Sequence, residues 1–277
     1  MKLFIIDTSV VAHLMCSRLC QYTLSDEERE LYVKASLHWI NALGMIPYFA
    51  DAQECHCIWA MDSKPYWRSR ILPTYKGNRS PSSHEVSLVL DIVRELNFQT
   101  IEFTGYEADD IAALFCAVYH RRPIRSTWES INLLTIDTDW QGLVSDGITW
   151  MDINGHEPRV RNIDALYQWF EGKHAKQPKK WQQAYPLPSV SEFRPSNIWQ
   201  WKSVVGDRSD NLPPGSPIGL IDLYQPPDEF RLWADSAIVQ KIEQTIRRLT
   251  KPTYSATDMT KIINGLGLSM PLSYIVL

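Results

Sequence analysis

The sequence predicts an α/β fold in which a parallel sheet is covered by helices on both faces. Five short apolar segments of strand character alternate with helical segments as far as residue 151. That alternation is typical of parallel strands joined by crossover helices. Acidic residues also follow four of the five segments, where the carboxyl ends of parallel strands form binding sites. A helical second half completes the chain.

The predicted strands are short apolar runs, as expected for strands buried on both faces. They cover residues 2–6, 57–61, 99–103, 131–136 and 148–151. The first run, KLFII, leads directly into Asp7-Thr8-Ser9, which predicts that a helix begins where the strand ends.

Helix signals fill the intervals between the strands. Ser25 and Glu28 form a capping box for a helix over residues 26–43, which Gly44 and Pro47 end. Another helix opens at Glu107, and a short helical turn is expected at 140–144. The remaining helices are expected over residues 9–19, 83–96, 162–170, 196–205 and 236–249. Residues 172–195, rich in Lys, Gln and Pro, indicate an insert or loop. We expect a catalytic core over residues 1–160 and a helical part over 161–277, packed as one unit.

The segment Glu107-Ala108-Asp109-Asp110 has two interpretations. Acids in a first helical turn are favoured by the helix dipole by about 0.3–1 kcal/mol each, so the motif alone fits ordinary helix capping. Four other places, however, put acids at strand or helix ends in the same way. The complete set is Asp7, Asp62, Glu107, Asp109, Asp110, Asp137, Asp139, Asp207 and Asp210.

Nine carboxylates brought together would not all stay ionised without compensation, because repulsion raises their pKa values. Hard oxygen ligands without His or Cys select Mg²⁺, with Mn²⁺ as a substitute, over zinc. Nine ligands exceed what one hydrated Mg²⁺ needs. The pattern therefore predicts two metal ions, an arrangement suited to phosphodiester hydrolysis. For any single Asp a turn or cap is the competing interpretation.

A basic segment without any acid runs from Ser63 to His84. Basic runs usually form solvated surface, but aromatic residues interrupt this one. Such a mixture fits phosphate contacts and base stacking, and Lys76 or Arg79 could stabilise a phosphoryl transition state. The predicted DNA-binding residues are Arg68, Arg70, Tyr75, Lys76 and Arg79.

Composition places few limits on the partner. The net charge of −4 argues against nucleic acid, yet setting the nine acids aside leaves the rest of the chain positive. Five cysteines without a C-x-x-C pair favour structural thiols in a reducing compartment. Asp7 interrupts the first apolar run, and no apolar run is long enough to span a membrane. We therefore expect a cytoplasmic protein.

Taken together, these residues resemble the 5′-nuclease superfamily: flap endonucleases, phage 5′-exonucleases and the 5′-exonuclease domain of bacterial DNA polymerase I. The motifs occur in the family's order over about residues 3–219. They are IIDTS, WAMD, YWRSRILPTYKGNR, GYEADDIAA, TIDTDWQGLVSD and VVGDRSDN. The phage-type flap endonucleases look most similar, through YKGNR and DTDWQGLVSD.

The resemblance implies a PIN-like fold and a Mg²⁺-dependent 5′-3′ exonuclease or 5′-flap endonuclease that leaves 5′-phosphates. It implies that Asp7, Asp62, Glu107 and Asp109 hold the first ion, with Asp110 nearby. It further implies that Asp137, Asp139, Asp207 and Asp210 hold the second, with Asp109 between the two. Lys76 and Arg79 match the base of the family's arch, which receives a 5′ single strand. The resemblance therefore implies catalytic roles for Lys76 and Arg79 and, as a ligand between the two ions, for Asp109. The implied partners are DNA with a 5′ single-stranded end or flap and replication proteins. We expect a monomer in a bacterial or phage-infected cytoplasm.

Two departures from the family pattern change these expectations. Only 30 residues separate Lys76 from Glu107, so the arch is expected to be short. After Gly219 the chain reaches Pro226-Pro227 without a Lys. We therefore expect a reduced helix-two-turn-helix-like segment at about 196–225, with the K⁺ site and the grip on duplex DNA reduced or lost.

Two other functions compete with this interpretation. A PIN-type ribonuclease uses fewer acids on a related sheet, and the nine acids with GDRSDN argue against it. A DNA-binding relative that keeps the acids without cutting is the other, favoured by the altered duplex grip.

Overall fold

A six-stranded sheet forms the centre of the molecule. The computed structural model describes residues 2–41, 55–80, 83–96, 98–121, 128–152 and 159–214. The strand order is β3-β2-β1-β4-β5-β6, with β1 to β5 parallel and β6 antiparallel to β5. The strands are β1 (Lys2–Asp7), β2 (Cys55–Met61), β3 (Thr100–Glu102), β4 (Ser130–Leu134), β5 (Ile148–Asp152) and β6 (Arg159–Arg161). All five predicted strands are present, and the predicted α/β class is confirmed.

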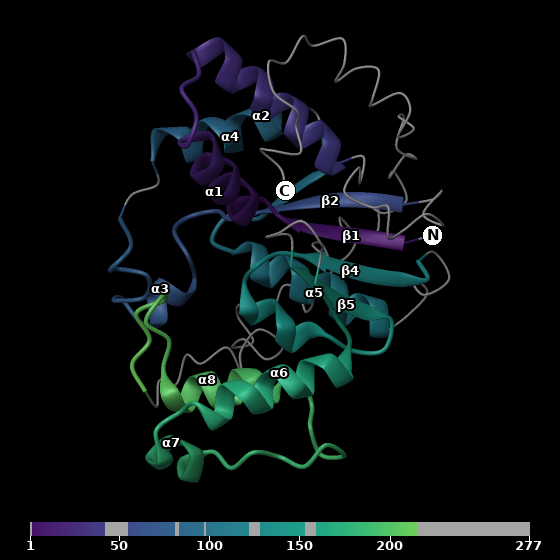
Figure 1. The fold of residues 1–277 in the computed structure, drawn as a ribbon, viewed down its shortest axis with the longest axis vertical. Helices are drawn as coiled ribbons and strands as arrows, with labels where there is room; N and C mark the ends of the chain where they lie inside the picture. Colours follow the sequence, from purple (N-terminus) through teal and green to yellow (C-terminus); the bar gives the residue numbers. More distant parts are fainter. Residues whose placement is uncertain are drawn as a thin grey trace.

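Helices cover both faces of this sheet (Figure 1). One face packs on α1 (Thr8–Leu19), α2 (Asp26–Asn41) and α4 (His84–Glu95). The other packs on α5 (Ala108–Arg121), the 3-10 helix η3 (Thr138–Leu143), α6 (Ile163–Ala175) and α8 (Asn197–Val205). Two short helices, α3 (Arg68–Ile71) and α7 (Lys179–Ala184), lie outside these layers.

Two hydrophobic cores result, one on each face. All seven residues of β2 are buried, as expected for a strand between two helical layers. Phe4 and Ile6 of β1 face the first core, while Leu3 and Ile5 face the second, following the two-residue alternation of a strand. Leu166, Phe170, Ile198, Trp199 and Trp201 of α6 and α8 belong to the second core, so these helices share the core of the sheet. The division of the chain at residue 160 stays a prediction.

Several local predictions are confirmed by the hydrogen bonds. The Ser25 amide donates to Glu28 Oε2 at 2.9 Å, and the Glu28 amide donates to Ser25 Oγ at 3.2 Å, which is the reciprocal capping box. Asp7 caps α1 by accepting from the Val10 amide at 3.1 Å. The last residue of β1 therefore also starts α1, which fixes its carboxylate at the edge of the sheet.

The second half differs from the prediction in detail. Residues 172–195 are not simply a loop, because α6 continues to Ala175 and α7 follows Pro178. The short helix α3 and the edge strand β6 were not predicted, since three or four residues carry too little periodicity. The predicted helix at 236–249 and the segment around Gly215 and Gly219 lie outside the described residues. Within the described part of the chain, no helix is long and apolar enough to cross a membrane.

Gly142 tests how tightly α8 packs on the second core. A Cβ atom at this position would lie 2.0 Å from the Trp199 ring, a fully buried indole. We expect Gly142→Ala to lower the free energy of unfolding by about 1–3 kcal/mol. Gly172→Ala in α6 is the matched control, since its Cβ meets nothing within 4 Å, and it should be neutral or stabilise by about 0.5–1 kcal/mol. Urea unfolding measures both, and equal effects would contradict the close packing.

Candidate active site

The predicted acids lie at the carboxyl edge of the sheet. Asp7 ends β1, Asp62 follows β2, and Asp137 follows β4. Because β1 pairs in parallel with both β2 and β4, these three positions are at neighbouring strand ends. Glu107 precedes α5, and Asp109 and Asp110 lie in its first turn.

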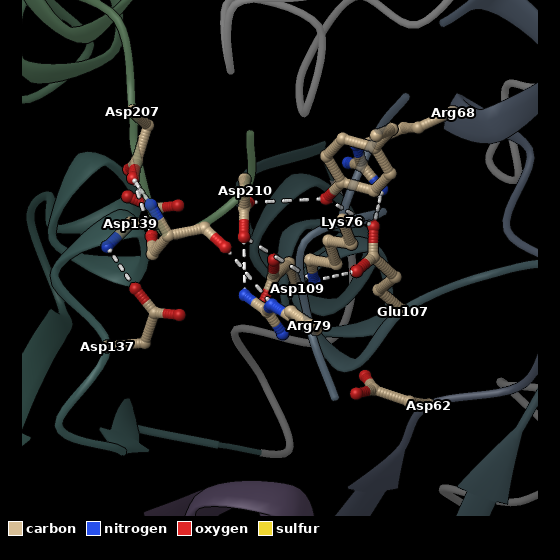
Figure 2. Close-up of polar contacts among 12 residues, drawn as sticks. Asp62, Arg68, Lys76, Arg79, Glu107, Asp109, Asp137, Asp139, Asp207 and Asp210 are labelled. Atoms are coloured by element: carbon tan, nitrogen blue, oxygen red, sulfur yellow. Dashed lines mark hydrogen bonds and ion pairs between the residues drawn. The ribbon is translucent and has the colours of Figure 1, made fainter. Parts of the chain in front are cut away.

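The second group of acids reaches the same edge from η3 and from the turn after α8 (Figure 2). Asp139 is in the first turn of η3, and Asp207 and Asp210 follow α8. Repulsion connects the groups: Asp62 and Asp137 both act on Asp7, and Asp207 acts on Asp137. The structure therefore brings residues from position 7 to position 210 into one acidic cluster.

Arg68 is the buried counter-ion of two of these acids. Its guanidinium donates to Glu107 at 2.7 Å and to both oxygens of Asp110 at 2.7 and 2.9 Å. The Arg68 side chain is only 3% exposed and stacks on the Trp67 ring at 4.5 Å. Burial alone would raise the pKa of Glu107, but pairing with Arg68 and Lys76 keeps that pKa below its usual value.

Lys76 and Arg79 extend from the segment after α3 into the cluster. The Lys76 ammonium binds Glu107 and lies 4.0 Å from Asp210, with the Tyr66 and Tyr75 rings each 5.3 Å away. Arg79 binds Asp210, and its side chain remains 48% exposed. Figure 2 shows both cations among the carboxylates. Lys76 is thus enclosed by the site, while Arg79 connects it to the surface.

Two turns more than a hundred residues apart interlock beside these ion pairs. We call residues 74–79 and 208–211 the clasp. The Lys76 amide donates to the Asp210 carbonyl at 2.9 Å, and Asn211 Nδ2 donates to the Thr74 carbonyl at 2.8 Å. Asn78 Nδ2 donates to the Arg208 carbonyl at 2.9 Å. Lys76 and Asn211 have φ values of 52° and 57°, a left-handed conformation that is costly outside glycine. The clasp holds the basic segment against the GDRSDN turn.

Lys202 is a site residue that the sequence analysis missed. Its ammonium binds Asp139 and lies 3.2 Å from Asp207. Although burial opposes it, Lys202 together with Ser209 keeps the pKa of Asp207 below its usual value. The predicted helix at 196–205 already placed Lys202 in its last turn, next to Asp207, and that spacing was the available signal.

Four acids of the cluster form no salt bridge within the described part of the chain: Asp7, Asp62, Asp109 and Asp137. They accept hydrogen bonds instead. Thr135 Oγ1 donates to Asp7 at 2.9 Å, and Trp140 Nε1 donates to Asp109 at 2.6 Å. The Ala108 amide donates to Asp62 at 2.7 Å.

The pKa values of these four acids are all raised. Burial, followed by repulsion from Asp62, raises the pKa of Asp7 to about 7. Burial, followed by repulsion from Asp137 and Glu107, raises that of Asp109 well above its usual value. Burial also raises the pKa of Asp62 and of Asp137. Lys76 acts on Asp62 and Asp109, and Lys202 acts on Asp137, but from beyond salt-bridge distance, and this attraction does not offset burial.

The donor set fits Mg²⁺ in its chemistry, because it consists of carboxylate oxygens and includes acids that lack a cation. In the described ranges, however, no three His, Cys, Asp or Glu side chains are already arranged to hold a metal ion. Lys76 binds Glu107, and Lys202 binds Asp139 and Asp207. An ion held by either predicted quartet would therefore compete with an ammonium group. Assembly of the two metal sites stays a prediction.

The predicted DNA-binding residues divide by exposure. Arg70 and Arg79 are exposed, so a phosphate can reach them. Arg68 and Tyr75 are 3% and 4% exposed, and Tyr75 donates to Glu107 at 2.8 Å. Both contact the acids at the start of α5 instead of facing solvent, and their predicted role in DNA binding stays a prediction.

Comparison with known protein families identifies the family to which the chain belongs. The 5′-3′ exonuclease N-terminal resolvase-like domain family matches residues 2–170, which contain seven of the nine acids and the whole basic segment. The chain belongs to the 5′-3′ exonuclease family. The predicted 5′-nuclease resemblance and PIN-like α/β fold class are thereby confirmed.

Individual relatives of this exonuclease family share modest identity with the chain. The 5′-3′ exonuclease of Bacillus subtilis is 27% identical over 225 residues, covering 78% of this chain and 66% of that protein. The thermostable DNA polymerase I of Thermus caldophilus is 29% identical over 159 residues, covering 56% of this chain. The match spans only 16% of that polymerase. The bacteriophage T5 D15 protein, co-crystallized with metal ions, has a TM-score of 0.48 and 17% identity, covering 99% of this chain and 87% of its own.

Asp7 should make stability fall with pH when metal is removed. Its carboxyl has a pKa of about 7 in the folded protein and about 3.9 when unfolded. The folded state therefore binds this proton more tightly, and the stabilisation it provides is lost as pH rises from about 4 to about 7. Asp7→Asn keeps the N-cap acceptor and removes the charge. In EDTA we expect it to gain about 2–4 kcal/mol over wild type between pH 4.5 and pH 8. Urea unfolding at both pH values measures this, and a constant difference would contradict it.

Proposed function

We propose that this chain is a divalent-metal-dependent 5′-nuclease that hydrolyses DNA phosphodiesters at 5′ ends or flaps. The observation that supports this most directly is the group of four carboxylates that form no salt bridge with the described residues, Asp7, Asp62, Asp109 and Asp137, at the same sheet edge as the Lys76–Arg79 segment. Carboxylates that could hold a metal ion and the side chains of Lys76 and Arg79, which could bind a phosphate, therefore lie at the same edge of the sheet. Membership of the 5′-3′ exonuclease family supports the proposal.

The acids would hold two Mg²⁺ ions, for which Mn²⁺ would substitute. Asp7, Asp62, Glu107 and Asp109 would hold the first, with Asp110 kept in place by Arg68. Asp137, Asp139, Asp207 and Asp210 would hold the second. When bound, the two ions supply the positive charge that activates a water and stabilises the leaving oxygen of a phosphodiester. Trp140 fixes the Asp109 carboxylate, and Thr135 fixes that of Asp7, so these ligands are oriented before an ion binds.

Lys76 and Arg79 would receive the scissile phosphate. Both are bound to carboxylates without DNA, and the planar guanidinium of an Arg can bind two oxygens of a phosphate as it binds two of a carboxylate. Arg79 is exposed enough to exchange Asp210 for a phosphate, while Lys76 is held by the clasp. Their charge would stabilise the phosphoryl transition state.

A DNA-binding relative that does not cut is the second candidate. The specific observation in its favour is that Lys76, Arg79 and Lys202 already neutralise Glu107, Asp139, Asp207 and Asp210. If those ion pairs do not open, the edge binds phosphate without holding two ions.

Cleavage of a labelled 5′-flap DNA with Mg²⁺ separates these functions. We expect wild type to release a product with a 5′-phosphate, and Asp109→Asn to lose at least about 100-fold in rate, because even supporting groups of a metal site contribute 10–100-fold. Asp146→Asn, an exposed acid before β5, is the control and should cut normally. Inactivity of all three proteins with DNA binding retained would identify the non-cleaving relative. Faster cleavage of the matched RNA flap would identify a PIN-type ribonuclease.

Lys202→Met tests whether the ammonium group and a metal ion compete for the same acids. Removing the cation leaves Asp139, which is 4% exposed, and Asp207 without their partner. We expect a loss of about 3–5 kcal/mol in EDTA, partly restored by Mg²⁺, and therefore a larger Mg²⁺-induced rise in melting temperature than for wild type. Lys34→Met, which breaks an exposed pair with Glu30, should change stability by less than about 1 kcal/mol. An identical Mg²⁺ response in Lys202→Met and wild type would exclude competition.

A further inference from the structure

The corner between α6 and α7 carries a dense positive charge. We define the basic corner as Lys173, Lys176, Lys179 and Lys180, which lie within eight residues. No Asp or Glu occurs from Gly172 to Ser191. All four lysines are exposed, and none of them forms a salt bridge with any residue that the structure describes. Its charge is therefore directed to solvent.

Helix stability explains Lys173 and Lys176, which lie in the last turn and at the C-cap of α6, where the helix dipole favours a positive charge. It does not explain Lys179 and Lys180. Lys179 and Lys180 are the first residues of α7, whose N-cap Pro178 provides no side-chain cap. A positive charge at a helix N-terminus is disfavoured by about 0.3–1 kcal/mol. The charge is thus placed where it weakens the local structure, which favours a role in binding.

The backbone of the corner is held in place by internal hydrogen bonds. Gln182 Nε2 donates to the Gln177 carbonyl at 2.7 Å and to the Ala175 carbonyl at 3.2 Å. His174 Nε2 lies 2.7 Å from the Tyr185 carbonyl. The Tyr185 hydroxyl donates to Gln200 of α8 at 2.9 Å. The lysines therefore project from a fixed platform attached to α8, the helix that leads to Lys202 and the GDRSDN turn.

The aromatic rings of the corner support the lysines. The Lys180 ammonium lies 4.7 Å from the Trp181 ring centroid, and that of Lys173 lies 5.7 Å from the Trp169 centroid. Four exposed lysines within eight residues favour recognition of phosphate charge. Duplex DNA offers one phosphate charge per about 1.7 Å of axis, a denser array than a single strand.

We infer that the basic corner binds the phosphate backbone of duplex DNA next to the cleavage site. Figure 1 shows α7 next to α8, and the chain after α8 leads to residues 208–211 of the clasp. The corner follows residues 2–170, which the family model matches. The inference rests on the proposed function only in taking DNA as the ligand.

The test is DNA binding without cleavage. Wild type and the triple variant Lys173→Gln/Lys179→Gln/Lys180→Gln are titrated in EDTA with a fluorescent 5′-flap duplex, by anisotropy, over a range of salt concentrations. We expect the variant to bind at least about tenfold more weakly and its slope of log K against log salt to be shallower by about 2–3. Single-stranded DNA of the flap sequence should show a much smaller difference.

The matched control removes the same charge from the opposite helical layer. Arg18→Gln/Lys34→Gln/Arg94→Gln changes α1, α2 and α4 and should leave the slope unchanged. Circular dichroism melting checks that both variants fold, and the lysines' exposure makes loss of the fold unexpected.

Each result decides the matter. An unchanged slope in the triple variant, an equal loss in the control variant, or a loss confined to single-stranded DNA would overturn the inference. Wild type that binds duplex but never cuts with Mg²⁺ would remove the proposed nuclease function, while the slope difference would still decide the role of the corner. Wild type that binds no duplex would overturn both.

Discussion

Repulsion among carboxylates at one edge of the sheet is the constraint on which the rest of the structure depends. The parallel topology forces the ends of β1, β2 and β4 together, and each of those ends carries an Asp. Burial makes the repulsion stronger, because the surrounding dielectric is low. Much of the remaining architecture supplies charge or hydrogen bonds to this edge: α3 places Arg68, the clasp places Lys76 and Arg79, and α8 places Lys202.

The cations do not reach every acid, and the acids without a salt bridge to any described residue lie together at one part of the edge. The cations are bound to acids at the start of α5, in η3 and in the turn after α8, while the acids that lack cations include two strand-end residues, Asp7 and Asp62. A fold that needed only stability would have replaced those acids with apolar residues, since uncompensated buried charge is costly. The presence of these acids fits a site at which the protein loses folding stability in exchange for function.

The sequence was sufficient for the sheet and for the placement of the acids. Apolar runs such as KLFII end at a polar residue, and the carboxyl ends of parallel strands lie at a common edge. The local pattern and the topology therefore both predicted that the acids lie at that edge. Which cations pair with which acids could not be predicted from the sequence, because that pairing depends on tertiary contacts. Arg68 and Tyr75 look like surface residues in a basic, aromatic segment, yet both are buried, Arg68 in the four-residue helix α3 and Tyr75 in the turn that follows it. Lys202 was missed because a lone lysine in a helix is usually solvated, and only the tertiary packing of α8 brings it to Asp139. Helix α7 was missed because Pro178 and the glutamines around it are typical of loops.

The clasp has a consequence for how the protein comes to be active. Strands β1 to β5 all lie before residue 153, so the sheet can form while the chain is still being synthesised. The clasp joins Thr74–Arg79 to Arg208–Asn211 across about 130 positions, and contacts of such separation form late because a long loop must close first. A nascent chain therefore contains the seven acids of the cluster from Asp7 to Asp139 before Asp207, Asp210 and the second turn of the clasp have been synthesised. The basic segment can be joined to the turn at 208–211 only after that turn has been synthesised.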